Sequence, residues 1–189
     1  MPSLRNFVTL FTFIVSLSTG TMAWGQQKII SEDILKVGKA LPNVTLKRFA
    51  GEAIQLDQLK GKIKIISIVP QLNTPVCDEQ THRFSEKNGG LDQFVDIITL
   101  STNSAEGQKK FAQKAKINNL IFLSDAPEYD FGKATGLLNS SFGYLKRTVI
   151  VVDENNIIRY VDFVPGGGLP NIEKALASAR MLLEENKPS

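Results

Sequence analysis

The chain has 189 residues, 42% of them hydrophobic and 22% charged, so it is long enough for one globular domain with a sizeable core but short for two. Its formal net charge of +3 is small, and basic and acidic residues are evenly mixed, which argues against nucleic acid as a partner. We therefore expect one domain that binds no nucleic acid.

Residues 1–25 have the layout of a secretory signal peptide. Arg5 precedes an apolar run at 7–17, and small residues lead up to Gln26. The run is short for a membrane span and is interrupted by polar residues. We predict cleavage before Gln26 and export to the periplasm or beyond, with an uncleaved membrane anchor as the alternative. Residues 26–189 would then form the mature domain.

Strand and helix patterns alternate along this domain. In chain order we predict two short strands around a turn at Ala50-Gly51 and a helical turn at 57–59, a strand at 62–69, a helix at 76–87, a strand at 94–102, a helix at 104–116, a strand at 120–125, a short helix at 129–136, two strands within 147–164 and a closing amphipathic helix at 171–185. This order predicts an α/β fold with a central sheet and helices on both faces. A tight turn joins the last two strands, so they must pair antiparallel and the sheet must be mixed.

The only cysteine, Cys77, lies in the stretch SIVPQLNTPVCDEQTHRF. One cysteine cannot form a disulfide within a chain, so the thiol must be buried and inert, paired between chains, or reactive. Thr74 stands at an N-cap position and Pro75 at the first helical position, which places Cys77 in the first turn of a helix. There the helix dipole and unpaired N–H groups favour the nucleophilic thiolate.

Two observations complicate that interpretation. Asp78 and Glu79 follow the cysteine directly, and their negative charges oppose a thiolate. Helix capping alone would also explain Thr74 and Pro75. Capping does not explain why the cysteine follows the carboxyl end of a buried strand, which is where ligands bind in open α/β sheets.

The stretch PQLNTPVC has the P-x-x-x-T-x-x-C pattern of peroxiredoxins, and the sequence resembles the thiol peroxidase branch of that family over nearly the whole mature region. Further stretches that carry the resemblance are LKVGKALPNVTL, FAGEAIQLDQLKGK, KKFAQKAKINNLIFLSD and LKRTVIVVDENNII. The resemblance implies a thioredoxin-like fold in which Cys77 is the peroxidatic nucleophile and Arg147 completes the site.

Each implied role is chemically reasonable. The Cys77 thiolate attacks a peroxide oxygen, which leaves a sulfenic acid and releases water or an alcohol. Arg147 donates to the peroxide and stabilises the thiolate. The Thr74 hydroxyl accepts a hydrogen bond from the hydroperoxide or donates one to it. The N–H groups of Val76 and Cys77 point to the same place. Pro70 shields the sulfur from water.

The sequence departs from the family at two places. Thiol peroxidases usually carry a resolving cysteine, and the matching position here is Ala112. Without it the sulfenic acid cannot close an intramolecular disulfide. Either an external thiol, thioredoxin-like or of low molecular weight, must reduce it, or Cys77 must pair transiently with another chain. The family's amino-terminal hairpin is also shortened, to residues 26–33. The resemblance further implies a homodimer.

We expect no metal or cofactor at this site. His82, the only histidine, lies on a different helix face from Cys77, and one cysteine with one histidine lacks the three or four ligands of a zinc site. A second interpretation is a thioredoxin-like redox sensor or binding protein without efficient turnover, which the missing resolving cysteine supports. A disulfide exchanger is disfavoured because CDEQ lacks the second cysteine of C-x-x-C. A glutathione-peroxidase-like site is disfavoured because it would use a tryptophan, and the mature region has none.

Overall fold

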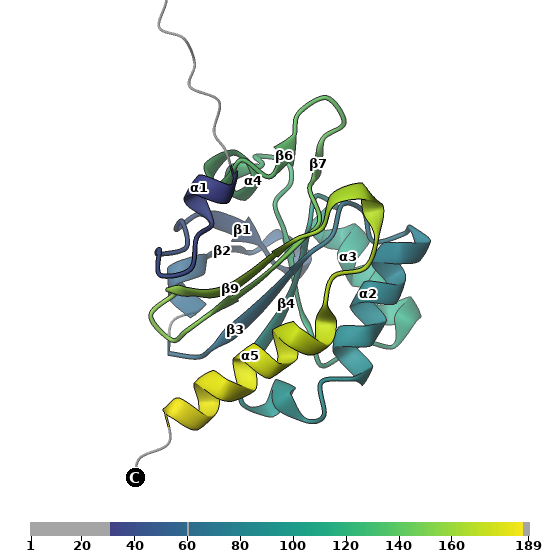
Figure 1. Ribbon diagram of the computed structural model, residues 1–189. Coiled ribbons are helices and arrows are strands. Elements are labelled where there is room, and N and C mark those ends of the chain that lie inside the picture. The colour runs from purple at the N-terminus through teal and green to yellow at the C-terminus, as the bar shows by residue number, and fades with distance from the viewer. Residues whose placement is uncertain (1–30, 60, 187–189) are drawn as a thin grey trace, which may run out of the picture.

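The computed structural model describes residues 31–59 and 61–186 (Figure 1). The predicted signal peptide lies outside these residues, as does most of the predicted shortened hairpin at 26–33. Within the described ranges, no helix is both long and apolar enough to cross a lipid bilayer.

A seven-stranded mixed sheet forms the centre of the molecule, in the order β2-β1-β5-β4-β3-β8-β9. Its strands are β1 (Thr45–Lys47), β2 (Ala53–Gln55), β3 (Lys64–Ile68), β4 (Asp96–Ser101), β5 (Ile121–Ser124), β8 (Thr148–Val152) and β9 (Ile158–Phe163). Strands β3, β4 and β5 run parallel, whereas β8 is antiparallel to both β3 and β9. The predicted mixed sheet of an α/β fold is confirmed.

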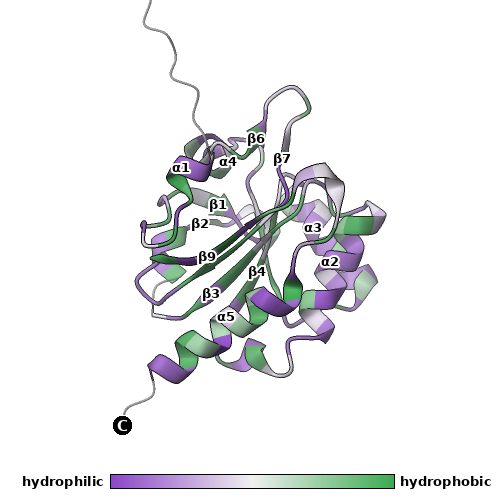
Figure 2. Cartoon of the chain, viewed as in Figure 1, coloured by the Kyte–Doolittle hydropathy of each residue, from purple (hydrophilic) through white to green (hydrophobic). Residues whose placement is uncertain are grey.

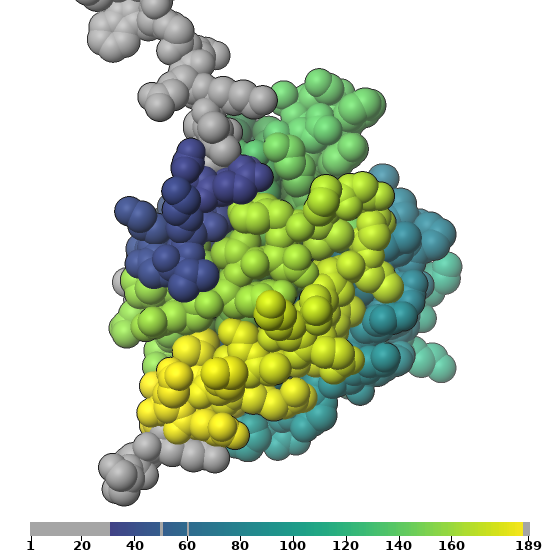
Figure 3. Space-filling model, in the orientation of Figure 1, coloured from purple at the N-terminus to yellow at the C-terminus, as the bar shows by residue number. Residues whose placement is uncertain are grey.

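Helices cover both faces of this sheet. They are α1 (Ser31–Ile34), α2 (Pro75–Glu86), α3 (Ala105–Ala115), α4 (Asp130–Thr135) and α5 (Ile172–Glu185). Side chains of α2, α3 and α5 share one hydrophobic core with one face of the sheet, and α4 and the residue after α1 contribute to a second core on the other face. Figure 3 shows α5, in yellow, lying against β9 and α2.

The central strands are buried on both sides. Every residue of β3 and of β8 is buried, which is why their sequences are nearly continuous runs of β-branched residues. In Figure 2, hydrophobic residues gather along these strands, whereas the helices mix hydrophobic with hydrophilic residues. Helix α2 begins a few residues after the carboxyl end of β3, so the buried position of β3 in the sheet determines where α2 starts.

The predicted helices and strands all occur, within a few residues of their expected ends. Several short elements were not predicted: α1, the small hairpin of β6 (Leu138–Asn139) and β7 (Tyr144–Leu145), and 3₁₀ turns at Leu91–Gln93 and Pro165–Gly167. These elements have two to four residues, too few for a periodic pattern to develop.

Candidate active site

The register of two strands brings Cys77 and Arg147 together. Ile68, the last residue of β3, pairs with Thr148, the first residue of β8. Arg147 precedes β8 and therefore lies at the carboxyl end of β3, from which the chain turns into α2. Arg147 Nη2 donates to Cys77 Sγ over 3.3 Å. Long-range pairing of this kind is not visible in a single sequence.

Both side chains are withdrawn from solvent. Cys77 is 1% exposed and Arg147 is 7% exposed. A guanidinium stays protonated even when it is buried, so it favours an anion beside it. Among the described residues, no carboxylate forms an ion pair with Arg147, and its side-chain partners are the thiol and an amide. A thiolate at Cys77 would supply the counter-charge for this guanidinium.

The acidic residues next to the cysteine are engaged elsewhere. Glu79 forms an ion pair with Arg83, and Asp78 lies 3.6 Å from His82, each one helical turn away. Both carboxylates are about half exposed, so solvent also screens their charges. Their repulsion of a Cys77 thiolate is thus smaller than the sequence alone indicates.

Sequence reasoning missed two polar residues that hold the arginine. Arg147 Nη1 donates to Gln80 Oε1, and Gln80 Nε2 donates to Ser67 Oγ over 2.8 Å. Gln80 and Ser67 are fully buried. The available signal was a glutamine three residues after the cysteine, on the buried face of α2, because such a residue must find hydrogen-bond partners inside the protein.

One donor of the arginine is free to bind a substrate. Its Nε is buried and has no hydrogen-bond partner among the described residues. In a planar guanidinium, the Nε–H and one Nη2–H point in the same direction. The edge of Arg147 that contacts Cys77 Sγ therefore also presents a spare N–H, to which an oxygen beside the sulfur could be an acceptor.

Thr74 occupies the N-cap position of α2, as predicted, but its side chain does not cap the helix. Its hydroxyl instead donates to the carbonyl of Gln71 over 2.9 Å, which leaves its oxygen lone pairs available as acceptors. The first helical bond runs from Asp78 N–H to the Thr74 carbonyl, over 2.9 Å. The N–H groups of Val76 and Cys77 precede that bond and have no acceptor within the helix.

The remaining predicted positions lie around this centre. Pro70 is half-buried and follows β3, at the base of the loop that leads to Cys77. Ala112 on α3 is 5% exposed and belongs to the same hydrophobic core as Cys77. His82 lies on another face of α2, between Asp78 and Glu86. The described residues hold no group of three or more side chains that could ligate a metal ion.

A cavity of ≈470 Å³ adjoins the site through Pro70 and Arg147. Its walls are mainly apolar and include Leu137, Tyr144, Phe163, Val164 and Pro165. Two oppositely charged residues, Lys146 and Glu32, also line the cavity. The organic part of a substrate could lie in this cavity while its reactive end is beside Arg147.

Comparison with known proteins shows which family the chain belongs to. The Redoxin family model matches residues 36–176. A thiol peroxidase of Halalkalibacterium halodurans is 35% identical over 150 residues, which cover 79% of this chain and 90% of that protein. The chain belongs to the thiol peroxidases of the redoxin family. A thiol peroxidase of Streptococcus pneumoniae is 38% identical over 128 residues, 67% of this chain and 78% of that protein.

Solved structures of the family have the same fold. A peroxiredoxin-like protein from Aquifex aeolicus superposes with a TM-score of 0.72 at 28% identity, over 78% of this chain and 88% of that chain. A thiol peroxidase from Chromobacterium violaceum has a TM-score of 0.65 at 19% identity, over 80% and 88%, and shows the fold alone. The resemblance inferred from the sequence and the predicted thioredoxin-like fold are confirmed.

Proposed function

We propose that this protein is a peroxidase that reduces hydroperoxides through Cys77, with an external thiol as the reductant. The observation that carries the proposal is the 3.3 Å contact between Arg147 Nη2 and Cys77 Sγ, in a thiol peroxidase whose sequence contains one cysteine. The contact places a permanent positive charge beside the only available nucleophile.

In the first half-reaction the Cys77 thiolate attacks one oxygen of the hydroperoxide. The O–O bond breaks, the sulfur becomes a sulfenic acid, and the departing oxygen takes a proton to leave as water or an alcohol. Negative charge develops on that oxygen, where Arg147 donors stabilise it most strongly. The oxygen of the Thr74 hydroxyl can accept a hydrogen bond from the O–H group of the arriving hydroperoxide.

The geometry supports both hydrogen peroxide and organic hydroperoxides as substrates. Burial of Cys77 restricts access to a small reactive group, which a peroxide end satisfies. The neighbouring cavity of ≈470 Å³ gives a mainly apolar environment for an alkyl portion.

The second half-reaction restores the thiol. A thiolate attacks the sulfenic sulfur, the S–O bond breaks, and water and a mixed disulfide form. A second thiol then attacks the mixed disulfide, which releases an organic disulfide and the Cys77 thiolate. Because Ala112 stands where the resemblance places the resolving cysteine, both thiols come from outside the chain.

The same missing cysteine favours a second candidate, a redox sensor that is oxidised but turns over poorly. We would oxidise the mature protein with one equivalent of hydrogen peroxide, trap the sulfenic acid with dimedone, and locate the adduct by mass spectrometry. Thioredoxin, glutaredoxin and glutathione systems would then be tested as donors. Recovery of the thiol with repeated turnover supports the peroxidase, and full oxidation without recovery by any donor would favour the sensor.

We also propose that residues 1–25 direct export of the protein and that the mature chain forms a homodimer. The layout of the leader sequence supports the first point, and the family resemblance supports the second. Amino-terminal sequencing of protein from an envelope fraction should begin at Gln26. Light scattering of the mature protein should give twice the chain mass, and a monomer at working concentration would contradict the dimer.

A further inference from the structure

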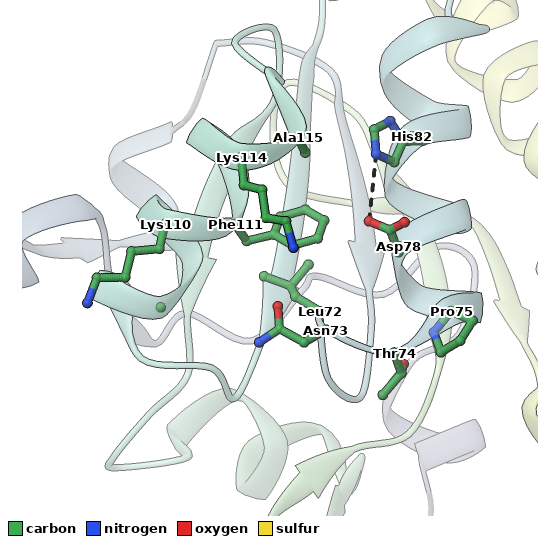
Figure 4. A pocket seen from close by; sticks show the side chains of 11 residues that line it. Leu72, Asn73, Thr74, Pro75, Asp78, His82, Lys110, Phe111, Lys114 and Ala115 are labelled. Atoms are coloured by element: carbon green, nitrogen blue, oxygen red, sulfur yellow. Dashed lines mark ion pairs between the residues drawn. The ribbon is translucent and has the colours of Figure 1, made fainter.

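We infer that a groove between α2 and α3 binds the thiol that reduces Cys77, and that this thiol is a zwitterionic peptide of low molecular weight. The inference rests on the proposed function, which requires an external reductant. The groove has a volume of ≈830 Å³ and lies between the amino-terminal half of α2 and the facing side of α3 (Figure 4). This volume is ample for a peptide of a few residues.

The groove has an apolar floor, formed by Leu72, Phe111 and Ala115. Lys114 extends its ammonium group over this floor from the α3 side, and the Asp78 carboxylate stands on the α2 side (Figure 4). Lys114 forms no ion pair within the described part of the chain, and Asp78 pairs with His82, which carries a charge only when protonated. A cation and an anion on opposite walls match a ligand with a carboxylate at one end and an ammonium at the other.

The groove also touches the helical turn that carries the nucleophile. Thr74 and Pro75 line it, and they begin the turn in which Cys77 lies. The side chain of Thr74 does not cap this turn. The turn therefore begins with a main-chain hydrogen bond from the Asp78 N–H to the Thr74 carbonyl and has no side-chain cap. Cys77 Sγ is 1% exposed, behind the turn. A peptide in the groove therefore lies against the segment that must shift before a second sulfur can reach Sγ.

The chemistry balances with two peptide thiols. The first forms an S–S bond with Cys77 as the S–O bond of the sulfenic acid breaks, and the hydroxide leaves as water with the proton of the thiol. The second attacks the sulfur of the bound peptide, the S–S bond between that sulfur and Cys77 breaks, and a peptide disulfide leaves while Cys77 regains its thiol with the proton of the second thiol. Two thiols are oxidised and one sulfenic acid is reduced to a thiol.

Glutathione is a suitable probe because it is a zwitterionic peptide thiol, and 2-mercaptoethanol is a matched thiol without charges. Oxidised wild-type protein would be mixed with each thiol, and the loss of sulfenic acid would be followed by quenched-flow mass spectrometry. We expect the rate with glutathione to saturate with concentration and the rate with 2-mercaptoethanol to rise linearly. In Lys114→Glu the ratio of the glutathione rate to the 2-mercaptoethanol rate should fall about fivefold.

Lys109→Glu is the control variant. Lys109 lies on α3 outside the groove, and its reversal changes the net charge of the protein by the same amount. The rate ratio should stay at the wild-type value. Equal losses in the two lysine variants, or a glutathione rate that never saturates, would overturn the inference. Reduction by a thioredoxin system with none by glutathione would overturn it as well.

A binding measurement separates this inference from the proposed function. S-methylglutathione cannot react, so calorimetric titration into the reduced protein tests the groove without any oxidation of Cys77. We expect binding that Lys114→Glu weakens about fivefold and Lys109→Glu leaves unchanged. Absence of binding to the wild-type protein would contradict the groove assignment, whatever the peroxidase assays show.

Discussion

Two buried cations lie at opposite ends of β3, and their surroundings differ. At the amino end, Lys64 is fully buried, and burial lowers the pKa of its ammonium, although the nearby carboxylates of Asp96 and Asp153 act in the opposite direction. At the carboxyl end, Arg147 is almost as buried, and its partners are a thiol and an amide. Acidic residues thus lie near the lysine, whereas the arginine contacts the Cys77 thiol.

The difference shows how burial of a charge can serve structure at one place and chemistry at another. The carboxylates near Lys64 offset part of the cost of burying its charge. Arg147 has no such carboxylate among the described residues, so its charge remains available to a thiolate and to a peroxide oxygen. Four predictions test this contrast.

The largest effect is expected at Arg147. Arg147→Leu should slow sulfenic acid formation at Cys77 on the order of 10²- to 10³-fold, because it removes the donors and the charge that stabilise the developing oxyanion. Stopped-flow oxidation with hydrogen peroxide measures this rate. Arg159→Leu removes an arginine that pairs with Asp153 at the opposite end of β8, and it should oxidise at the wild-type rate. Similar rates for the two variants would contradict the assigned role.

A smaller effect is expected at Gln80, which orients the guanidinium. Gln80→Leu removes the acceptor for Arg147 Nη1 and should slow oxidation about tenfold, which corresponds to ~1.4 kcal/mol. Gln80→Glu keeps an acceptor at the same place, so its oxidation rate should fall less than that of Gln80→Leu. An oxidation rate of Gln80→Leu equal to that of the wild type would show that the arginine is held by other contacts.

At Lys64 we expect an effect on stability and none on oxidation. The folded state binds the ammonium proton less tightly than the unfolded chain, so stability should rise with pH between the lowered pKa and the ordinary lysine value of 10.5. Lys64→Met abolishes this gain. Urea unfolding from pH 7 to pH 10 should show the wild type gaining stability relative to the variant. If the difference in unfolding free energy between the wild type and Lys64→Met stayed constant with pH, it would contradict the cost assigned to burying this ammonium.

The smallest effect concerns Asp125, a buried acid that follows β5 at the same sheet edge as the site. Burial raises its pKa to about 6 from 3.8, even though the N–H groups of Phe131 and Gly132 donate to its carboxylate. The folded state therefore binds this proton more tightly, and its contribution to stability falls as pH rises from 3.8 to about 6. In Asp125→Asn the free energy of unfolding, measured by urea unfolding across this pH range, should no longer fall as pH rises. A fall equal to that of the wild type would contradict the raised pKa of Asp125.

Much of the fold was predictable because its elements are long enough to show a pattern. The buried strands β3 and β8 are rich in isoleucine and valine, and the Thr-Pro pair marks the start of α2. The hydroxyl of Thr74 was harder to predict, since it bonds to Gln71 and not to the helix. Local sequence indicates where a helix begins but not which of several nearby acceptors a hydroxyl will choose.

The candidate site was predictable only in part. The motif identified Cys77, Thr74 and Pro70, and the resemblance identified Arg147. Gln80 was missed because its partners, Ser67 in β3 and Arg147 just before β8, are brought together only in the folded sheet. The groove beside Lys114 was missed for the same reason, since its walls belong to α2 and α3.

The central claim is that Cys77 is a peroxidatic thiol activated by its surroundings. The most direct test is the second-order rate constant for sulfenic acid formation in the mature wild-type protein, measured by stopped flow with hydrogen peroxide and an organic hydroperoxide. We predict a rate constant several orders of magnitude above that of free cysteine, since positioning and electrostatic stabilisation each contribute several kcal/mol. A rate constant equal to that of free cysteine would contradict the account.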